Sequence, residues 1–325
     1  PGRQIFAHTN DGVSSNTPNL MTLGANGQLH LATFRSQTDT YFQRETKPAD
    51  ATETIRQFTG ARGLTGNIYF NVILEDNGTR PGILANNFYL PGEDSWAGPV
   101  WVAHEDANGD PVRAKSVVST ANNPIQSALF AIGEDDDPLY AKSSDRTAKL
   151  VSLGTYKVSH MSVVTDASGQ NNSDRLNVFA IERDTGKLLF KKEKKYQTGS
   201  TTQWDDWIAV DPGQGVRLTS IFAAQQYDNL LQVFGIGDDG RLYWTGQLPG
   251  EGRSATPEWQ PILALGNEIP SNPADSASIF AVGRDSNRYS EAFTVSAAGN
   301  VKRFWQAPTT QQWFQQHIEL ERTDD

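Results

Sequence analysis

Tryptophan residues flanked by acidic, amide or aromatic residues recur in the second half of the sequence. Sugars present C–H faces that stack on aromatic rings, and their hydroxyls pair with carboxylate, amide and backbone groups. An indole beside polar hydrogen-bonding groups therefore indicates carbohydrate binding. The candidate contacts are Trp204, Asp205, Trp207, Tyr243, Trp244, Trp259, Trp305, Gln306 and Trp313, together with Asp285 at the end of a predicted strand.

Each of these tryptophans also has a structural interpretation. One tryptophan per repeat is a common packing residue between neighbouring sheets, and for any single ring this interpretation is the favoured one. For the whole set, we expect at least one exposed aromatic pocket. The two interpretations stay open for each individual ring.

Other kinds of site find little support. The sequence has no cysteine and no G-x-S-x-G elbow, and its five histidines show no HxH or HExxH spacing. The run Glu134-Asp-Asp-Asp137 could attract calcium, but it occupies a predicted hairpin turn and lacks the spaced calcium-loop pattern. We expect a solvated turn there, and neither a metal nor a cofactor in the protein.

Carboxylates at strand ends leave an enzymatic alternative. Asp11, Asp166 and Asp285 follow predicted inner strands. Two acids about 5 to 10 Å apart across a central mouth would suit sugar hydrolysis, as in a six-bladed lactonase or glycosidase. Only some of the predicted inner strands end in an acidic residue. Exposed acidic residues at strand ends are most often simply solvated. A non-catalytic protein is the favoured hypothesis, with the hydrolase and a protein-docking propeller as alternatives.

Hairpins provide the elements that must position these residues. The segment Leu231–Trp244 reads as an apolar strand, an Asp-Asp-Gly turn and a second strand, and Asp-Gly between apolar runs is a strong hairpin signal. Turns recur roughly every 50 to 60 residues, near the period of propeller blades. Matching segments are residues 20–29, 127–140, 176–190 and 291–301, and residues 67–78 match in their first strand only.

Two further motifs complete each repeat. A short strand of small and β-branched residues precedes the hairpin, and a tryptophan segment follows several of them. The first motif is at residues 4–8, 115–119, 161–165, 220–224 and 278–282, and the second at 204–208, 258–262 and 312–318. Four strands per unit, repeated radially, predict an all-β protein with one β-propeller.

The predicted domain spans residues 1–325 and has about six four-stranded blades. Its N-terminal segment would close the ring beside the C-terminal blade. Residues 82–112 are irregular and fit an elaborated second blade, or a degenerate seventh. Residues 51–58 are the best helix candidate, although a short one.

Bulk composition limits the partners. The chain has 325 residues, a net charge of −10 and no run of eighteen apolar residues. An acidic chain is a poor partner for nucleic acid, because neutralising phosphates requires a surplus of Lys and Arg. No membrane span is expected.

The repeat resembles the tectonin-type and related bacterial β-propeller lectins. The resemblance is carried by Val233–Tyr243 with Trp259 and by Val178–Ile181 with Trp204 and Trp207, and it covers roughly residues 115–320. It implies multivalent, metal-free binding of glycans or glycoconjugates between blades. It also implies a secreted or cell-surface protein, either free or as a targeting domain. No tryptophan follows the hairpin within residues 142–156, so fewer pockets than blades are expected, two or three.

Overall fold

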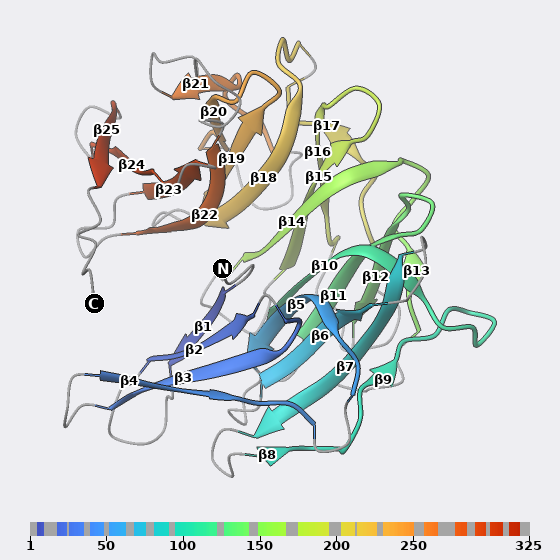
Figure 1. Cartoon of the computed structure of the whole chain (residues 1–325). Helices are drawn as coiled ribbons and strands as arrows, with labels where there is room; N and C mark the ends of the chain where they lie inside the picture. The colour runs from blue at the N-terminus through green and yellow to red at the C-terminus, as the bar shows by residue number, and fades with distance from the viewer. Residues whose placement is uncertain are drawn as a thin grey trace. The chain divides into compact units, whose positions relative to one another are not determined.

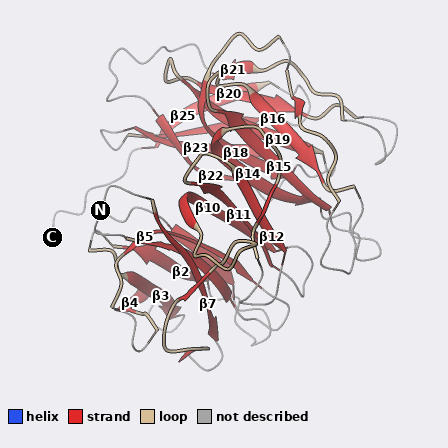
Figure 2. Cartoon of the chain, turned by 90° about the vertical axis from the view of Figure 1, so that its right-hand side faces the viewer, coloured by secondary structure: helices blue, strands red, loops and turns tan. Residues whose placement is uncertain are grey.

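A computed structural model shows strands and no helix in the described part of the chain (Figure 1, Figure 2). The all-β prediction is therefore confirmed, and no described helix could span a membrane. The described residues are 5–9, 18–24, 26–35, 40–48, 52–62, 68–75, 81–90, 95–121, 127–142, 149–166, 175–194, 203–211, 213–225, 230–249, 257–265, 277–284, 290–296, 300–307 and 312–318.

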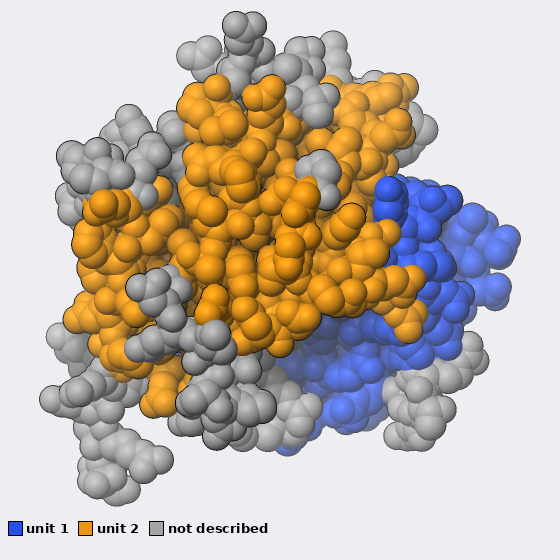
Figure 3. All heavy atoms as spheres, turned by 90° about the horizontal axis from the view of Figure 1, so that it is seen from above, with its two compact units in different colours: residues 1–157, 196–202 blue, residues 158–195, 203–325 orange. Residues whose placement is uncertain are grey.

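The chain divides into two compact units (Figure 3). Unit 1 comprises Pro1–Lys157 and Tyr196–Thr202, and unit 2 comprises Val158–Lys195 and Gln203–Asp325. The prediction of one ring closed by the N-terminal segment stays a prediction.

Unit 1 contains two antiparallel sheets. The first is a four-stranded meander in chain order, formed by β1 (Ile5–Thr9), β2 (Pro18–Leu23), β3 (Leu29–Arg35) and β4 (Thr40–Glu45). The second sheet has nine strands. They are β5 (Ile55–Arg62), β6 (Ile68–Leu74), β7 (Gly82–Leu90), β8 (Ser95–Trp96), β9 (Val102–Ala103), β10 (Arg113–Ala121), β11 (Ser127–Gly133), β12 (Pro138–Lys142) and β13 (Val151–Ser152).

The nine-stranded sheet is two meanders joined where β10 pairs with β7. The irregular region 82–112 supplies β7 and two short strands, β8 and β9, that both pair with β7. The expectation of a helix over residues 51–58 is wrong, because β5 begins at Ile55 and pairs with β6. Ile55 and Phe58 are both buried, and the short-strand motif did not predict β5.

The first strands of the two meanders, β5 and β10, lie side by side and are joined by polar side chains. The Thr59 and Ser119 hydroxyls are 3.0 Å apart, and the Gln57 amide donates to the Val117 carbonyl at 3.2 Å. Short side chains allow this close approach, as the inner-strand motif predicts.

Unit 2 contains three four-stranded antiparallel meanders, each in chain order. The first is β14 (Val158–Asp166), β15 (Arg175–Glu182), β16 (Leu188–Lys192) and β17 (Ile208–Ala209). The second is β18 (Leu218–Gln225), β19 (Leu231–Gly237), β20 (Leu242–Gly246) and β21 (Leu263–Leu265). The third is β22 (Ala277–Arg284), β23 (Ser290–Ser296), β24 (Val301–Gln306) and β25 (Trp313–Ile318).

The second strand of these meanders is buried on both faces. Every residue of β19 is buried, and Val178 and Phe179 in β15 are fully buried. A strand with only one face against the core would alternate in burial, so β15 and β19 are each covered on both sides. The hairpin prediction also holds: Gly240 in the β19–β20 turn has a φ of +77°, which glycine accepts without strain.

Candidate functional site

Register fixes which side chains share a face in each sheet of unit 2. Residues directly opposite each other in an antiparallel pair lie on the same face. In the β14–β17 sheet, Phe179 is opposite Phe190. In the β18–β21 sheet, Phe234 is opposite Trp244. Each sheet thus presents a pair of large aromatic rings at one register position.

The predicted tryptophans of the outer strands pack on these ring pairs. Trp259 contacts Phe179 and Phe190 with ring centroids 5.4 Å away in both cases. Trp313 contacts Phe234 and Trp244, both at 5.5 Å. Each indole therefore lies between its own sheet and the preceding one, as expected for a residue that packs neighbouring sheets together.

The indole N–H groups of these rings have little contact with solvent, although Trp259 and Trp313 are only partly buried as residues. The indole N–H groups of Trp259 and Trp313 are buried and have no hydrogen-bond partner among the described residues. Trp244 is 5% exposed, and its N–H donates to the Gln232 amide oxygen at 3.3 Å. Trp204 bridges to Glu193 as Trp259 bridges to Gln247, so Trp204 occupies the same register position.

The β22–β25 sheet departs from this pattern. Arg303 is opposite Phe293, at the position that Phe190 and Trp244 occupy in the other sheets. Glu291 is opposite Trp305, at the position of Asn177 and Gln232. Phe293 thus keeps the first ring of the aromatic pair, Arg303 replaces the second ring, and Glu291 and Trp305 lie at the next register position of the same face.

These residues form one continuous face, which we call the Arg303 face: Glu291, Arg303, Trp305, Phe314 and Gln316. Arg303 and Glu291 form an ion pair, and the guanidinium carbon is 5.2 Å from the Trp305 ring centroid. Trp305 stacks on Phe314 with centroids 5.6 Å apart and planes at 23°. Phe314 is 44% exposed.

The Arg303 face can bind a ligand that is partly apolar and partly hydroxylated. Two stacked rings offer apolar area, the guanidinium offers donors, and the carboxylate and the Gln316 amide offer acceptors. The Arg303 Nε–H is buried and has no hydrogen-bond partner among the described residues, so a ligand at the surface would reach the guanidinium through its Nη groups.

A second polar and aromatic group surrounds Trp207. Asp205 and Asp206 are exposed, Trp207 is half-buried, and the Lys191 Nζ is 5.4 Å from the Trp207 ring centroid. Burial lowers the pKa of Lys191, while Asp206 and Asp205 oppose that shift by attracting the ammonium. Trp207 therefore has an internal cation near its ring.

The remaining predicted residues lie apart from the Arg303 face. The Tyr243 hydroxyl donates to Asp239 Oδ2 at 2.7 Å in the β19–β20 turn, and burial, reinforced by Asp239, raises the pKa of Tyr243 to about 12. Gln306 is opposite Trp313 at the end of β24. Asp285 lies outside the described residues.

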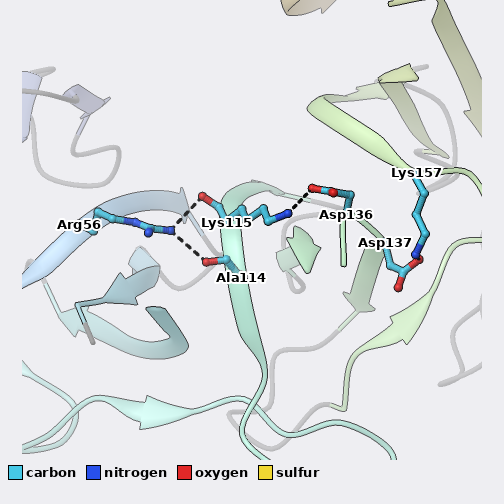
Figure 4. A network of polar contacts seen from close by, with 6 residues as sticks. All are labelled: Arg56, Ala114, Lys115, Asp136, Asp137 and Lys157. Carbon is cyan, nitrogen blue, oxygen red and sulfur yellow. Dashed lines mark hydrogen bonds and ion pairs between the residues drawn. The ribbon is translucent and has the colours of Figure 1, made fainter. Parts of the chain in front are cut away.

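The acidic run Glu134–Asp137 forms the predicted hairpin turn (Figure 4). Lys115 Nζ pairs with Asp136 at 2.5 Å, and Lys157 Nζ pairs with Asp137 at 2.7 Å. Arg56 donates to the carbonyls of Ala114 and Lys115 beside them. Lysines thus pair with two of the four carboxylates. No metal-binding group of three or more His, Cys, Asp or Glu occurs in the described residues.

Arg303, Glu291 and Phe314 are not among the contacts that the sequence predicts. A signal existed in the third strand of each repeat. Leu188-Leu-Phe190 and Leu242-Tyr-Trp244 end on a large ring, whereas Val301-Lys-Arg303 ends on a cation.

Comparison with known proteins gives structural likeness only. No protein-family model matches the chain, and no curated protein matches it. AofleA from Arthrobotrys oligospora matches with a TM-score of 0.55 at 10% identity, over 98% of this chain and 86% of that one. The SapL1 lectin in complex with alpha methyl fucoside matches with a TM-score of 0.55 at 12% identity, over 98% of this chain and 96% of that one.

Two further structures show how widely the fold is shared. The fucose-specific lectin from Aleuria aurantia matches with a TM-score of 0.50 at 13% identity, over 96% of this chain and 94% of that one. BBS1N in complex with ARL6DN matches with a TM-score of 0.56 at 10% identity, over 94% of this chain and 79% of that one. The chain therefore has an all-β fold of the kind found in propeller lectins.

Proposed function

We propose that this chain is a non-catalytic saccharide-binding protein and that the Arg303 face is its principal contact surface. The observation that carries the proposal is the placement of Arg303, ion-paired with Glu291 and lying over Trp305, where the other two sheets of unit 2 have a packed aromatic ring. An exposed Phe314 extends the same surface.

The chemistry of this face suits a pyranose ring. Trp305 and Phe314 would take the C–H side of the sugar, and Arg303, Glu291 and Gln316 would bond its hydroxyls. Aromatic contacts of this kind contribute about 0.5–1.5 kcal/mol beyond area burial, and one small open site gives weak binding, with a Kd on the order of 1 mM. Several such sites would give strong attachment through avidity.

We propose the Trp204–Trp207 segment as a second contact. Exposed Asp205 and Asp206 beside the half-buried Trp207 provide acceptors next to an aromatic ring. Its geometry differs from that of the Arg303 face, because Lys191 rather than an arginine lies near the ring. The two surfaces would therefore differ in saccharide preference.

The lectins of similar fold support fucosides as the first ligands to test, since one is described as fucose-specific and another is in complex with alpha methyl fucoside. A single propeller of six four-stranded blades, closed by the N-terminal segment and secreted or displayed on a cell surface, fits the proposal. The meanders of the two units supply the repeats for such a ring.

A glycan array that includes fucosides tests the function. The native chain is expected to bind at least one saccharide, and Trp305→Ala should weaken that binding at least about tenfold, because it removes the stacking ring. The control is Leu263→Ala, which removes an exposed apolar side chain from the outer strand of the neighbouring sheet. Absence of binding at high protein density would overturn the proposal.

One observation favours a protein-docking role as the second candidate. BBS1N, which shares the fold, is in complex with a protein partner, ARL6DN. A partner protein that stays bound in the presence of competing saccharides, and that Trp305→Ala does not release, would favour this role over saccharide binding.

A further inference from the structure

The Arg303 face carries no net charge. Its charged residues are one cation, Arg303, and one anion, Glu291, and the other members Trp305, Phe314 and Gln316 are neutral. The Glu291 side chain is only 11% exposed, whereas that of Arg303 is 33% exposed. A carboxylate so deeply buried needs a charged partner, and here it takes the guanidinium.

The equivalent positions of the other sheets are uncharged. Asn177 and Gln232 stand where Glu291 stands, and Phe190 and Trp244 stand where Arg303 stands. Glu291 and Arg303 therefore occur together in one sheet and are both absent at these positions from the other two. Packing alone does not require the pair, because the other two sheets pack without it.

We propose that Glu291 is a specificity-determining residue that restricts the Arg303 face to uncharged saccharides. This inference rests on the proposed function and names the ligand class of the same surface. A neutral sugar leaves the ion pair intact and bonds the remaining Nη–H groups of the guanidinium and the remaining lone pairs of the carboxylate.

An acidic sugar would compete with Glu291. A carboxylate ligand binds arginine best through two parallel N–H bonds, and the Glu291 carboxylate already draws on the donors of Arg303. The ligand would also bring a second negative charge next to a buried one, which is unfavourable. The chain charge of −10 adds a general repulsion.

Matched pairs of immobilised saccharides test the inference: galactose with galacturonate, glucose with glucuronate, and fucose as a neutral reference. The native chain should prefer the neutral member of a pair by at least about tenfold, as like-charge juxtaposition predicts. Glu291→Gln keeps the side-chain shape and frees the guanidinium, so this preference should shrink or reverse, and uronate binding should weaken with added salt.

Two control variants separate charge at the face from other effects. Glu258→Gln removes an exposed acid from the neighbouring sheet and should leave the preference unchanged. Glu291→Asp keeps the charge and should keep the preference for neutral sugars. Circular dichroism of each variant reports whether its sheets are intact. The comparison of neutral and acidic sugars on the native chain needs no variant, so it tests the inference even if a variant does not fold.

The possible outcomes are distinct. Equal binding of neutral and uronate sugars by the native chain, or an unchanged preference in a folded Glu291→Gln variant, overturns the specificity role and leaves saccharide binding standing. Binding of no saccharide by the native chain overturns both proposals.

Discussion

Trp313 provides the sharpest test of how the sheets of unit 2 are held together. Its ring lies 5.5 Å from Phe234 and 5.5 Å from Trp244, two side chains that are 0% and 5% exposed. Trp313→Ala removes the indole from between them and leaves a cavity that two rigid rings cannot fill. Substitutions of this type lower the free energy of unfolding by about 3–5 kcal/mol.

Trp313→Phe distinguishes lost packing from a lost hydrogen bond. The indole N–H is buried without a hydrogen-bond partner in the described residues, and an unsatisfied buried donor costs about 1–3 kcal/mol. Phenylalanine retains a ring and removes that donor, so relief of the unsatisfied N–H offsets part of the lost contact. We expect Trp313→Phe to cost about 0–2 kcal/mol, well below the alanine variant.

Urea unfolding followed by far-ultraviolet circular dichroism measures these differences. For an m-value of about 3 kcal/mol/M, the alanine variant should shift the midpoint by roughly 1–1.5 M. Phe314 is the matched control, because it is the next residue and is 44% exposed. Phe314→Ala should cost under about 1 kcal/mol and should still weaken saccharide binding. Equal destabilisation by Trp313→Ala and Phe314→Ala, or by both Trp313 variants, would refute the packing role.

Three further predictions concern turns of the two units. Gly186 has a φ of +71°, and an added Cβ would lie 2.9 Å from the Arg217 Cα, so Gly186→Ala should destabilise by about 1–3 kcal/mol in the same assay. Asp136 has a φ of +66°, a conformation that glycine adopts more easily than alanine. Asp136→Ala should therefore lower the free energy of unfolding by roughly 1 kcal/mol more than Asp136→Gly does. Equal losses in the two variants would exclude backbone strain at this position. The pKa of Tyr243 rises from 10.0 to about 12, so the folded chain holds that proton more tightly than the unfolded chain. This stabilisation is complete below pH 10.0 and is lost as the pH rises through about 12. Tyr243→Phe should therefore reduce the pH dependence of the free energy of unfolding between these two pH values.

The hairpins were predictable because their signals are local. The turn at Asp238–Gly240 combines a glycine at positive φ with apolar strands on both sides, all within fourteen residues. Strand β5 lacked such a signal. Its Ile55 pairs with Leu74 and its Thr59 meets Ser119, and neither partner is visible in the local pattern of residues 51–58.

The candidate site was predictable only in part, for the same physical reason. A tryptophan flanked by polar residues suits a saccharide and also suits packing between sheets. The partners that decide the matter for Trp259 are Phe179 and Phe190, which come from the preceding sheet. Trp305 was predicted as a saccharide contact and stacks on the exposed Phe314, and its role in binding stays a prediction. Arg303 was not predicted, because a cation at the end of a strand usually indicates solvent.

Restoring the repeat at Arg303 separates stability from binding. Replacing a buried ion pair by well-packed hydrophobic residues is often neutral or stabilising by about 1–4 kcal/mol. The double variant Glu291→Gln with Arg303→Phe reproduces the Gln232 and Phe190 positions of the other two sheets. It should therefore unfold at the same or a higher urea concentration than the native chain and lose saccharide binding at this face. Marked destabilisation would assign the pair to the structure of the sheet, because the charged residues would then be needed for folding rather than for a ligand.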